Sequence, residues 1–192
     1  MKQRSIIIRA LFLMSALCIL LASGCTTKAS KEPLVYKVGE TGPAGGIVFY
    51  DKGERTDGWR YLEAAPARTE VFAAWPEALV PIDTETKVGS GRSNTELLVK
   101  ADSTGSETAA TACDTLAIKT YSDWFLPSKD ELSLLFTNLA RTGKDSFLKE
   151  GYAYWSSSSF DAERAWAQGF SNGVQGRVEK SELLVVRAIR AF

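Results

Sequence analysis

The sequence predicts a single α+β domain in which strands come first, helices occupy the middle, and strands return at the end. Two β-rich segments lie before residue 66, three helical patterns lie between residues 93 and 143, and further β-rich patterns follow residue 150. Elements that are segregated in this way are typical of α+β domains, whereas regular alternation predicts α/β folds. The 192 residues suffice for one domain with a substantial core.

Two short strands are expected near the start of the domain. Residues 47–50 are β-rich, follow a turn at Pro43, and are ended by Asp51-Lys52-Gly53. The second strand lies within GWRYLEAAP, residues 58–66. Four glycines surround the preceding turn, but a phosphate loop would lead into a helix and contain Gly-Lys-Ser/Thr, so no phosphate site is predicted there.

The middle of the chain is expected to hold a loop and then helices. Residues 69–91 have the composition of a loop. Ser93 and Glu96 have capping-box spacing and predict the start of the first helix. Residues 106–118 place small apolar residues at helical spacing, and Cys113 lies on that apolar stripe. Cys113 is therefore interpreted as a buried hydrophobic residue rather than a nucleophile.

The third helix has the clearest boundaries. Ser128 and Glu131 form another capping-box pattern, Leu132 and Leu135 begin an apolar face, and Gly143 ends the helix. Strands are expected afterwards. Alternation over 166–170, a tight turn at Asn172-Gly173 and a return over 174–180 predict a hairpin, and residues 183–192 predict one long final strand.

The N-terminus has the features of an export signal. Basic residues are followed by an uncharged apolar run over residues 11–21, by small residues at 22–24, and by Cys25. This order resembles the lipobox of bacterial lipoproteins, in the relaxed form familiar in spirochaetes. The resemblance implies cleavage before Cys25 and lipidation of its sulfur. A plain secretory signal followed by an incidental cysteine is the alternative.

The predicted organisation is a signal peptide over residues 1–24, a lipidated Cys25 with a short tether up to residue 36, and a domain over 37–192. Two or more lipid chains give stable membrane anchoring. We therefore expect a lipid-anchored protein of the cell envelope, on the outer membrane and facing outward, whose first partner is the membrane.

Composition argues against several classes of chemistry. Residues 1–24 hold three of the 23 basic residues and none of the 23 acidic ones, so the rest of the chain has a net charge of −3 and is not expected to bind nucleic acid. The chain has no histidine, and Cys113 is the one cysteine left after Cys18 and Cys25. Catalytic residues, metal sites and cofactors are therefore not predicted, although a structural calcium ion stays open.

Six segments in order carry a resemblance: GPAGGIVFYDKG, GWRYLEAAP, YSDWFLPSKDEL, YAYWSSSS, AWAQGFSNG and VVRAIRAF. Over residues 37–192 the chain resembles the Lcl C-terminal domain family, which is named for a collagen-like adhesin. The resemblance implies a C-type-lectin-like fold of the formylglycine-generating-enzyme type, with short antiparallel strands, two or three helices, and adjacent first and last strands. The layout is similar to a Treponema variable lipoprotein of a diversity-generating retroelement.

The resemblance also divides the side chains into framework and binding surface. The implied framework residues are Trp124, Phe125, Leu126, Pro127, Trp155, Ser156, Ser157, Trp166, Phe170, Asn172, Gly173, Arg187 and Arg190. The implied ligand-binding residues are Tyr152, Tyr154, Ser159, Phe160, Asp161, Glu163, Arg164, Gln168, Val174, Gln175, Arg177 and Glu179. An exposed mixture of aromatic residues and arginine is typical of binding surfaces. The alternative is that these are ordinary solvated loop residues.

The chain departs from two relatives of this fold. It lacks the cysteine pair of formylglycine-generating enzymes and the Glu-Pro-Asn or Gln-Pro-Asp motif of calcium-dependent lectins. The expected function is therefore binding of a protein or glycan ligand without catalysis. Whether a retroelement diversifies the C-terminal region is a question that only the DNA sequence can answer. The alternatives are an envelope hydrolase with paired carboxylates and a structural envelope protein.

Overall fold

The computed structural model describes residues 34–77, 82–103, 105–148 and 150–192. The chain divides into two units, Met1–Leu34 and Val35–Phe192, and the helices and strands described below belong to the second. The predicted signal peptide, the lipidation site Cys25 and residues 26–33 of the tether lie outside the described residues. Within the described ranges, no helix is long and apolar enough to cross a membrane.

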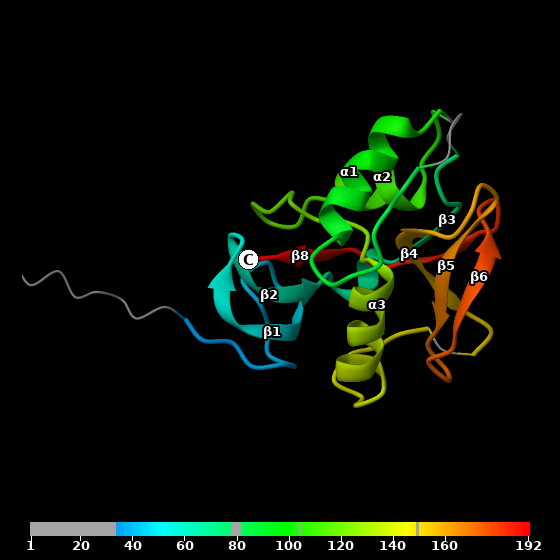
Figure 1. Ribbon diagram of the computed structural model, residues 1–192. Coiled ribbons are helices and arrows are strands. Elements are labelled where there is room, and N and C mark those ends of the chain that lie inside the picture. Colours follow the sequence, from blue (N-terminus) through cyan, green and yellow to red (C-terminus); the bar gives the residue numbers. More distant parts are fainter. Residues whose placement is uncertain (1–33, 78–81, 104, 149) are drawn as a thin grey trace, which may run out of the picture. The chain divides into compact units, whose positions relative to one another are not determined.

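The first sheet joins the two ends of the domain. It consists of β1 (Ile47–Thr56), β2 (Trp59–Ala64) and β8 (Ile189–Ala191), all antiparallel, with β2 in the centre (Figure 1). The prediction that the first and last strands share a sheet is confirmed. The predicted end of β1 at residues 51–53 is wrong, because the strand continues to Thr56 through a register shift after Asp51.

The second sheet is larger and mixed. Its strand order is β3-β7-β4-β5-β6. Its strands are β3 (Val71–Ala73), β4 (Ala153–Ser159), β5 (Arg164–Gly169), β6 (Gln175–Glu179) and β7 (Leu184–Val186). β4 and β7 pair in parallel, while the other neighbouring strands are antiparallel. The predicted α+β class is confirmed, but β3 lies in the segment that was predicted to be a loop.

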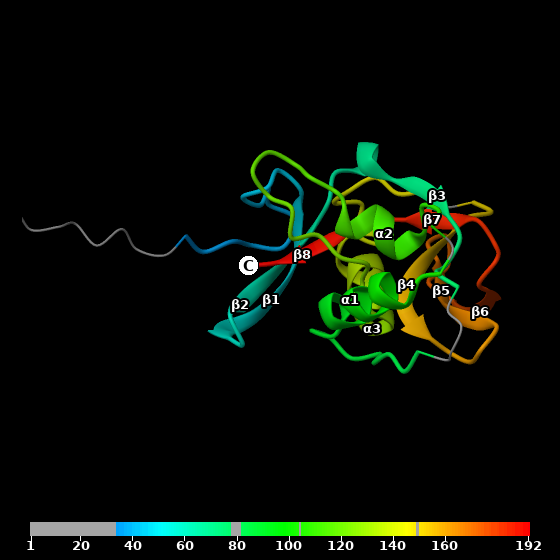
Figure 2. The same ribbon diagram turned by 90° about the horizontal axis from the view of Figure 1, so that it is seen from above.

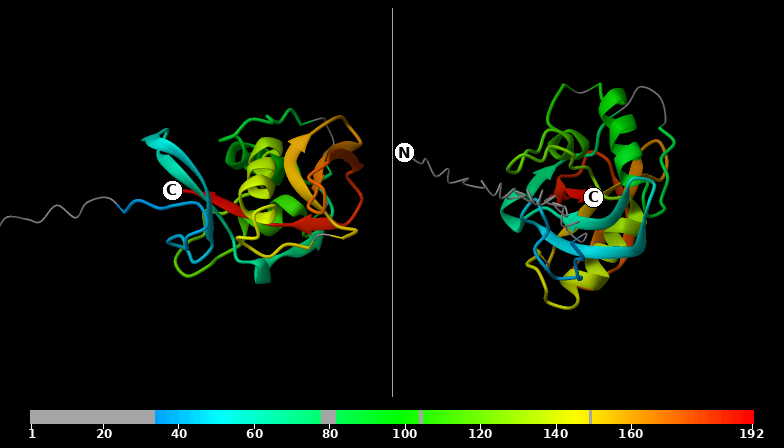
Figure 3. Two further views of the ribbon diagram at one scale, coloured as in Figure 1. Left: turned by 90° about the horizontal axis from the view of Figure 1, so that it is seen from below. Right: turned by 90° about the vertical axis from the view of Figure 1, so that its left-hand side faces the viewer.

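The final segment is not the single strand that the sequence predicted. β7 ends at Val186 in the second sheet, and β8 begins at Ile189 in the first, so the chain crosses between the sheets at Arg187 and Ala188 (Figure 3). The crossing is fixed from inside, because the buried Arg187 guanidinium pairs with Glu70 and Asp145. An unbroken apolar pattern cannot reveal such a change of sheet, since both halves are buried.

The helices pack against the second sheet, and the third of them also contacts β1 of the first sheet (Figure 2). They are α1 (Gly91–Ala101), α2 (Ala109–Asp114) and α3 (Lys129–Leu135), which continues as the π-helical turn η2 (Phe136–Ala140). A short 3-10 helix, η1 (Ala67–Thr69), precedes β3. The predicted capping box at Ser93 is wrong, because α1 begins two residues earlier and the Ser93 hydroxyl donates to the carbonyl of Ser90.

The prediction for the second helix is only partly correct, whereas the predicted cap of the third is confirmed. α2 is shorter than the predicted 106–118 and has a Thr108–Thr111 capping box. Cys113 is fully buried in it, and burial raises the pKa of the thiol, as expected for a structural cysteine. The capping box of α3 is confirmed, since the Glu131 carboxylate accepts from the backbone N–H of Ser128 at 2.7 Å.

The glycine-rich segment before β1 packs around a buried carboxylate of the chain itself. Glu63 of β2 is fully buried and accepts from the backbone N–H groups of Gly46 at 2.7 Å and Ala44 at 3.3 Å. A Cβ at Gly46 would collide with the Ala64 carbonyl, so only glycine fits there. Arg190 of β8 supplies the opposite charge at 3.3 Å.

Candidate functional site

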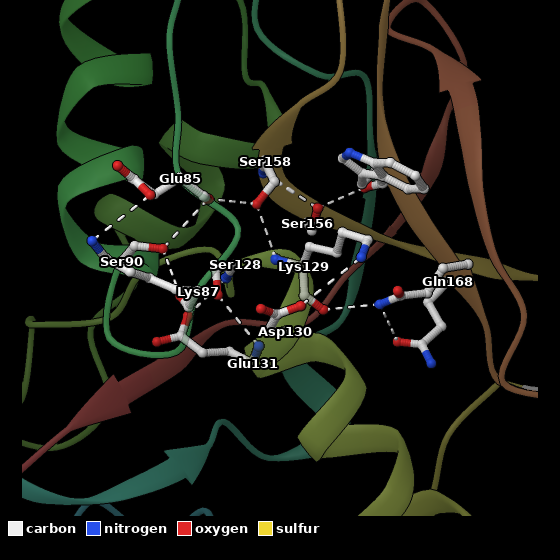
Figure 4. Close-up of polar contacts among 12 residues, drawn as sticks. Glu85, Lys87, Ser90, Ser128, Lys129, Asp130, Glu131, Ser156, Ser158 and Gln168 are labelled. Carbon is white, nitrogen blue, oxygen red and sulfur yellow. Dashed lines mark hydrogen bonds and ion pairs between the residues drawn. The ribbon is translucent and has the colours of Figure 1, made fainter.

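The serine run of β4 forms the base of the candidate site, and its hydroxyls point into the protein. Ser156, Ser157 and Ser158 are all fully buried. The Ser156 hydroxyl donates to the carbonyl of Trp166 on β5 at 2.7 Å, and the Ser158 hydroxyl donates to the carbonyl of Glu85 at 2.8 Å (Figure 4). Because a buried hydroxyl without a partner is costly, these bonds fix the segments that they join.

These serines hold the loop over residues 82–90 against β4 and the start of α3. Ser158 also accepts from the backbone N–H of Lys129 at 3.0 Å (Figure 4). The N–H of Ser159 donates to the Thr84 hydroxyl at 2.7 Å. Asn94 of α1 donates to Glu85 and to Ser157. The loop is therefore attached to the framework through specific polar contacts, rather than through apolar packing alone.

A pocket lies where β4 ends. This pocket of about 230 Å³ is lined by residues 82–84 of this loop, by Ser159 at the end of β4 and by residues 160–162 after it. Ser159 is partly buried, whereas Phe160 exposes 37% of its surface. The exposed surface therefore begins directly after the buried serine run.

Phe160 is flanked by cations. The guanidinium of Arg177 lies 4.0 Å from its ring centroid and that of Arg164 lies 5.3 Å away. The ring of Trp166 meets Phe160 edge-on at 5.5 Å. Cation–π contacts of this kind contribute about 0.5–1 kcal/mol each at exposed sites and hold the arginines in place without using their hydrogen-bond donors.

The same arrangement continues onto α3. Lys129 Nζ lies 4.7 Å from the Trp166 ring, and Arg177 stands directly opposite Trp166 in the register of β5 and β6. We call Lys129, Phe160, Arg164, Trp166 and Arg177 the Phe160 cluster. It alternates cations and aromatic rings across the β4–β5 turn, the β5–β6 hairpin and the first turn of α3.

Charged contacts fix the turn that presents Phe160. Asp161 accepts from the Arg164 side chain and from the backbone N–H groups of Glu163 and Arg164. The Arg164 hydrogen bond holds the pKa of Asp161 below its usual value. Lys180 Nζ donates to the carbonyls of Asp161 and Ala162, and burial lowers the pKa of this lysine. The turn is thus held from both sides.

The structure brings together most of the residues that were predicted to bind a ligand. Arg164 faces Glu179 across β5 and β6. Those that lie at the turn or on the adjoining ends of β4, β5 and β6 are Ser159, Phe160, Asp161, Glu163, Arg164, Arg177 and Glu179. Whether they bind a ligand stays a prediction.

Two of the predicted binding residues are internal, so the expectation that they belong to an exposed surface is wrong. Tyr154 is fully buried because its ring packs 4.3 Å from that of Phe170 and its hydroxyl accepts from the Leu148 N–H and donates to Glu70. Burial raises the pKa of this tyrosine. Gln168 exposes only 2% because its amide donates to the Gly173 carbonyl inside the hairpin.

The remaining predicted residues lie away from the Phe160 cluster or at its margin. Tyr152 is exposed, but its ring contacts Phe72 of β3 at 5.7 Å, on the other side of β4. Val174 is exposed just before β6. The Gln175 amide donates to the carbonyl of Lys129 at 3.0 Å and so links the hairpin to α3.

Sequence reasoning missed two members of the Phe160 cluster. Trp166 was assigned to the framework, yet it lies between the buried Ala165 and Ala167, so its ring points outward. Small residues on both sides of a strand tryptophan were the available signal, because side chains alternate between faces. Lys129 offered no signal, since a lysine in the first turn of a helix is most simply explained by solvation.

No group of acids and cysteines in the described part of the chain could hold a metal ion, so the described residues add no support for a structural calcium site.

A comparison with curated proteins finds no match. The family described as Lcl C-terminal domain matches residues 74–190, which include every strand and helix of the Phe160 cluster. Since this match covers more than half of the chain, the protein belongs to the Lcl C-terminal domain family.

Proposed function

We propose that this protein is a lipid-anchored envelope protein that binds a protein or glycan ligand, without catalysis, through the Phe160 cluster and the adjoining pocket. The observation that carries the proposal is an exposed aromatic ring in contact with two guanidinium groups on a buried framework. Aromatic residues and arginine dominate the energetics of binding surfaces.

The geometry favours binding because the site is held in place before any ligand arrives. The serine run fixes one wall of the pocket, and Asp161 with Lys180 fixes the turn that carries Phe160. Ordering a free side chain on binding costs about 0.5–1.5 kcal/mol, so prior fixation strengthens binding. The Arg177 side chain makes no hydrogen bond within the described ranges, which leaves its guanidinium donors for a ligand.

The position of the cluster agrees with display from a membrane anchor. The chain enters the domain next to the first sheet, where Tyr36 packs against Tyr61 and Phe192. The hairpin of β5 and β6 lies at the opposite end of the domain (Figures 1 and 2). The described domain therefore begins at the end farther from the Phe160 cluster.

Catalysis by paired carboxylates is less well supported at this site. A general acid needs a carboxyl group with a raised pKa. Asp161 has a lowered one, because Arg164 forms hydrogen bonds with it. A hydrolase would therefore require a different acid pair.

The experiment uses the full chain, purified in detergent, on arrays of host-surface proteins and glycans. A Phe160→Ala/Arg177→Ala variant is expected to lose about tenfold or more in affinity for any hit, since such anchors often contribute 2 kcal/mol or more. Leu183→Ala is the matched control, because Leu183 is an exposed apolar residue outside the site. Unchanged binding by the double variant would contradict the proposal.

Two further measurements separate the alternatives. Sedimentation of the full chain would reveal an oligomer if the exposed surface joins copies of a structural protein. Diversification by a retroelement requires a second near-copy of the 3′ coding end, differing mainly at adenines, close to the gene. Without that copy, the surface has a fixed ligand.

A further inference from the structure

A second pocket lies apart from the Phe160 cluster, between the first sheet and the starts of α1 and α3. Its volume is about 250 Å³, near the lower end of ordinary small-molecule sites. Six of its lining residues carry the argument: Trp59, Leu62, Arg92, Glu96, Phe125 and Glu131. The family match begins at residue 74, so the part of this pocket that β2 provides precedes it.

The inner part of the pocket is apolar. Leu62 and Phe125 are buried, and Trp59 is partly buried. The indole edge at Trp59 Cζ2 lies 3.5 Å from the place where a Cβ would stand on Gly89, which is an ordinary van der Waals distance, so the loop packs against the ring. Trp59 Nε1 makes no hydrogen bond to any residue that the structure describes. This surface suits a small apolar group.

The mouth of the pocket has one positive and one negative side chain from the same helix. Arg92 and Glu96 are four residues apart on α1, which places them on one face. They form no ion pair with each other, although that spacing permits one, and Glu96 has no partner in the described part of the chain. Both groups therefore present a charge at the mouth.

Arg92 is held in position but keeps donors. Its Nη2 donates to the Asp123 carbonyl at 3.1 Å, and its guanidinium lies 4.9 Å from the Phe125 ring centroid. Nε and Nη1 have no partner among the described residues, and the side chain is 42% exposed. A guanidinium with two free donors is suited to a carboxylate, which it can bind through paired hydrogen bonds.

We propose that this pocket binds a small zwitterion, namely a free α-amino acid with an apolar side chain. Its carboxylate pairs with Arg92, its ammonium group pairs with Glu96, and its side chain contacts Leu62, Phe125 and the indole edge of Trp59. This site is separate from the Phe160 cluster, so a negative result for one site would not count against the other.

Charge selects this class over others. A purely anionic ligand would meet the carboxylates of Asp57 and Glu96 at the pocket. A purely cationic ligand would meet Arg92. The third carboxylate, Glu131, is fully buried and already accepts from the N–H groups of Ser128 and Gly89, so it is not available to a ligand. A neutral ligand would leave the Glu96 carboxylate without a partner among the described residues, whereas Arg92 already lies 3.8 Å from Asp123.

The test titrates the full chain in detergent with L-leucine while the indole N–H signals are followed by NMR. The Trp59 signal is assigned with a Trp59→Phe variant. Saturable movement of that signal is expected. Leucinol, which lacks the carboxylate, and 4-methylpentanoate, which lacks the ammonium group, are each expected to bind about tenfold or more weakly. Glucose tests a neutral ligand.

The variants separate the charge pair from the fold. Arg92→Gln and Glu96→Gln are each expected to weaken leucine binding about tenfold or more, whereas Glu182→Gln, at an exposed acid elsewhere, is expected to leave it unchanged. The Glu96 side chain makes no hydrogen bond or ion pair among the described residues, so its variant keeps the fold even if Arg92→Gln does not. Phe160→Ala/Arg177→Ala is also expected to bind leucine normally.

Three results would overturn the proposal. The first is no movement of the Trp59 signal at about 10 mM leucine. That concentration would largely fill a site whose dissociation constant is about 1 mM. The second is equal binding of leucine and 4-methylpentanoate, which would show that Glu96 does not hold an ammonium group. The third is saturable binding of glucose in preference to leucine.

Discussion

The four arginines that follow residue 150 lie in two regions with opposite surroundings. Arg187, just after β7, and Arg190, on β8, are buried, whereas Arg164 and Arg177, on β5 and β6, reach solvent. All four are the same residue type in strand-like sequence. Comparing them shows which feature of the surroundings decides whether an arginine stabilises the fold or remains available to a ligand.

The buried pair is surrounded by carboxylates. Arg187 pairs with Asp145, and with Glu70 at 2.6 Å. Arg190 donates to both oxygens of Asp123, at 2.8 and 2.9 Å, and lies 3.3 Å from Glu63. The donors of these arginines are used inside the protein, so each guanidinium ties distant segments together.

The exposed pair contacts a ring instead. The Arg177 guanidinium lies over Phe160 and makes no hydrogen bond that the structure describes. Arg164 uses its side-chain donors on Asp161 within the same turn. A ring contact fixes a guanidinium without consuming its donors. The difference teaches that the partner, rather than the residue type or its strand position, separates a structural arginine from a candidate binding arginine.

The largest expected effect follows from removing a buried arginine. Arg187→Leu should lower the free energy of unfolding by about 3–5 kcal/mol, because Glu70 and Asp145 would be left as unpaired charges away from water. Urea denaturation of the full chain measures it. Arg177→Leu is the matched control at an exposed position. A loss below about 1 kcal/mol for Arg187→Leu would contradict the comparison.

The next effect depends on pH. Burial by itself raises the pKa of Asp123, but the hydrogen bonds and charge of Arg190, aided by Arg92, outweigh it, so its pKa is lowered in the fold. The Asp123 carboxylate therefore stabilises the fold at pH values above its unfolded pKa of about 3.9. This contribution is lost as the pH falls through the lowered pKa of the folded state.

Asp123→Asn should accordingly cost about 1–2 kcal/mol at pH 7, a reduced figure because the carboxylate is partly solvated. The cost should shrink as the pH falls below about 4. Urea denaturation at pH 7 and at lower pH values measures this. A penalty that stays constant across the range would show that the Arg190 pair does not govern the effect.

A smaller effect is expected at the serine run. Ser158→Ala removes the donor to the Glu85 carbonyl and the acceptor of the Lys129 N–H, which should cost about 1–2 kcal/mol. Amide hydrogen exchange should quicken at Lys129. Ser133→Ala, on α3 and partly exposed, serves as the control. Unchanged protection of Lys129 would mean that the hydroxyl does not hold the loop.

The smallest effect is expected at the exposed arginine. Arg177→Ala should change the free energy of unfolding by less than about 0.5 kcal/mol, as is usual for surface positions. Denaturant titration alongside Arg187→Leu gives the direct contrast. A loss above about 2 kcal/mol would place Arg177 among the structural residues and weaken its assignment to a binding surface.

Local patterns predicted the parts of the fold that depend on neighbouring residues. The Ser128–Glu131 capping box, the turn at Asn172-Gly173 and the burial of Cys113 all agree with the structure. The predictions failed where partners are distant. The start of α1 at Gly91 depends on a close approach to Leu126 and Glu131, which no pattern around Ser93 could indicate.

For the candidate site too, residue type predicted some members correctly, and distant contacts overruled it at others. Phe160, Arg164 and Arg177 were predicted from their residue types on a segment that the family resemblance marks as variable. Tyr154 carried the same signal, but its ring fits beside Phe170 and its hydroxyl finds Glu70, 84 residues away in the chain. Exposure of an aromatic residue is decided by such distant partners.

The sequence by itself determined the α+β class, the order of the elements, the helix cap at Ser128 and the membership of the Lcl C-terminal domain family, because these depend on local periodicity and on motifs in order. The resemblance had already assigned Ser156, Ser157, Arg187 and Arg190 to the framework. Tertiary structure alone decided that the last segment divides between two sheets, which segments the serine hydroxyls join, and which carboxylates pair with the buried arginines. The reason is that buried polar groups need partners, and those partners come from segments far apart in the chain.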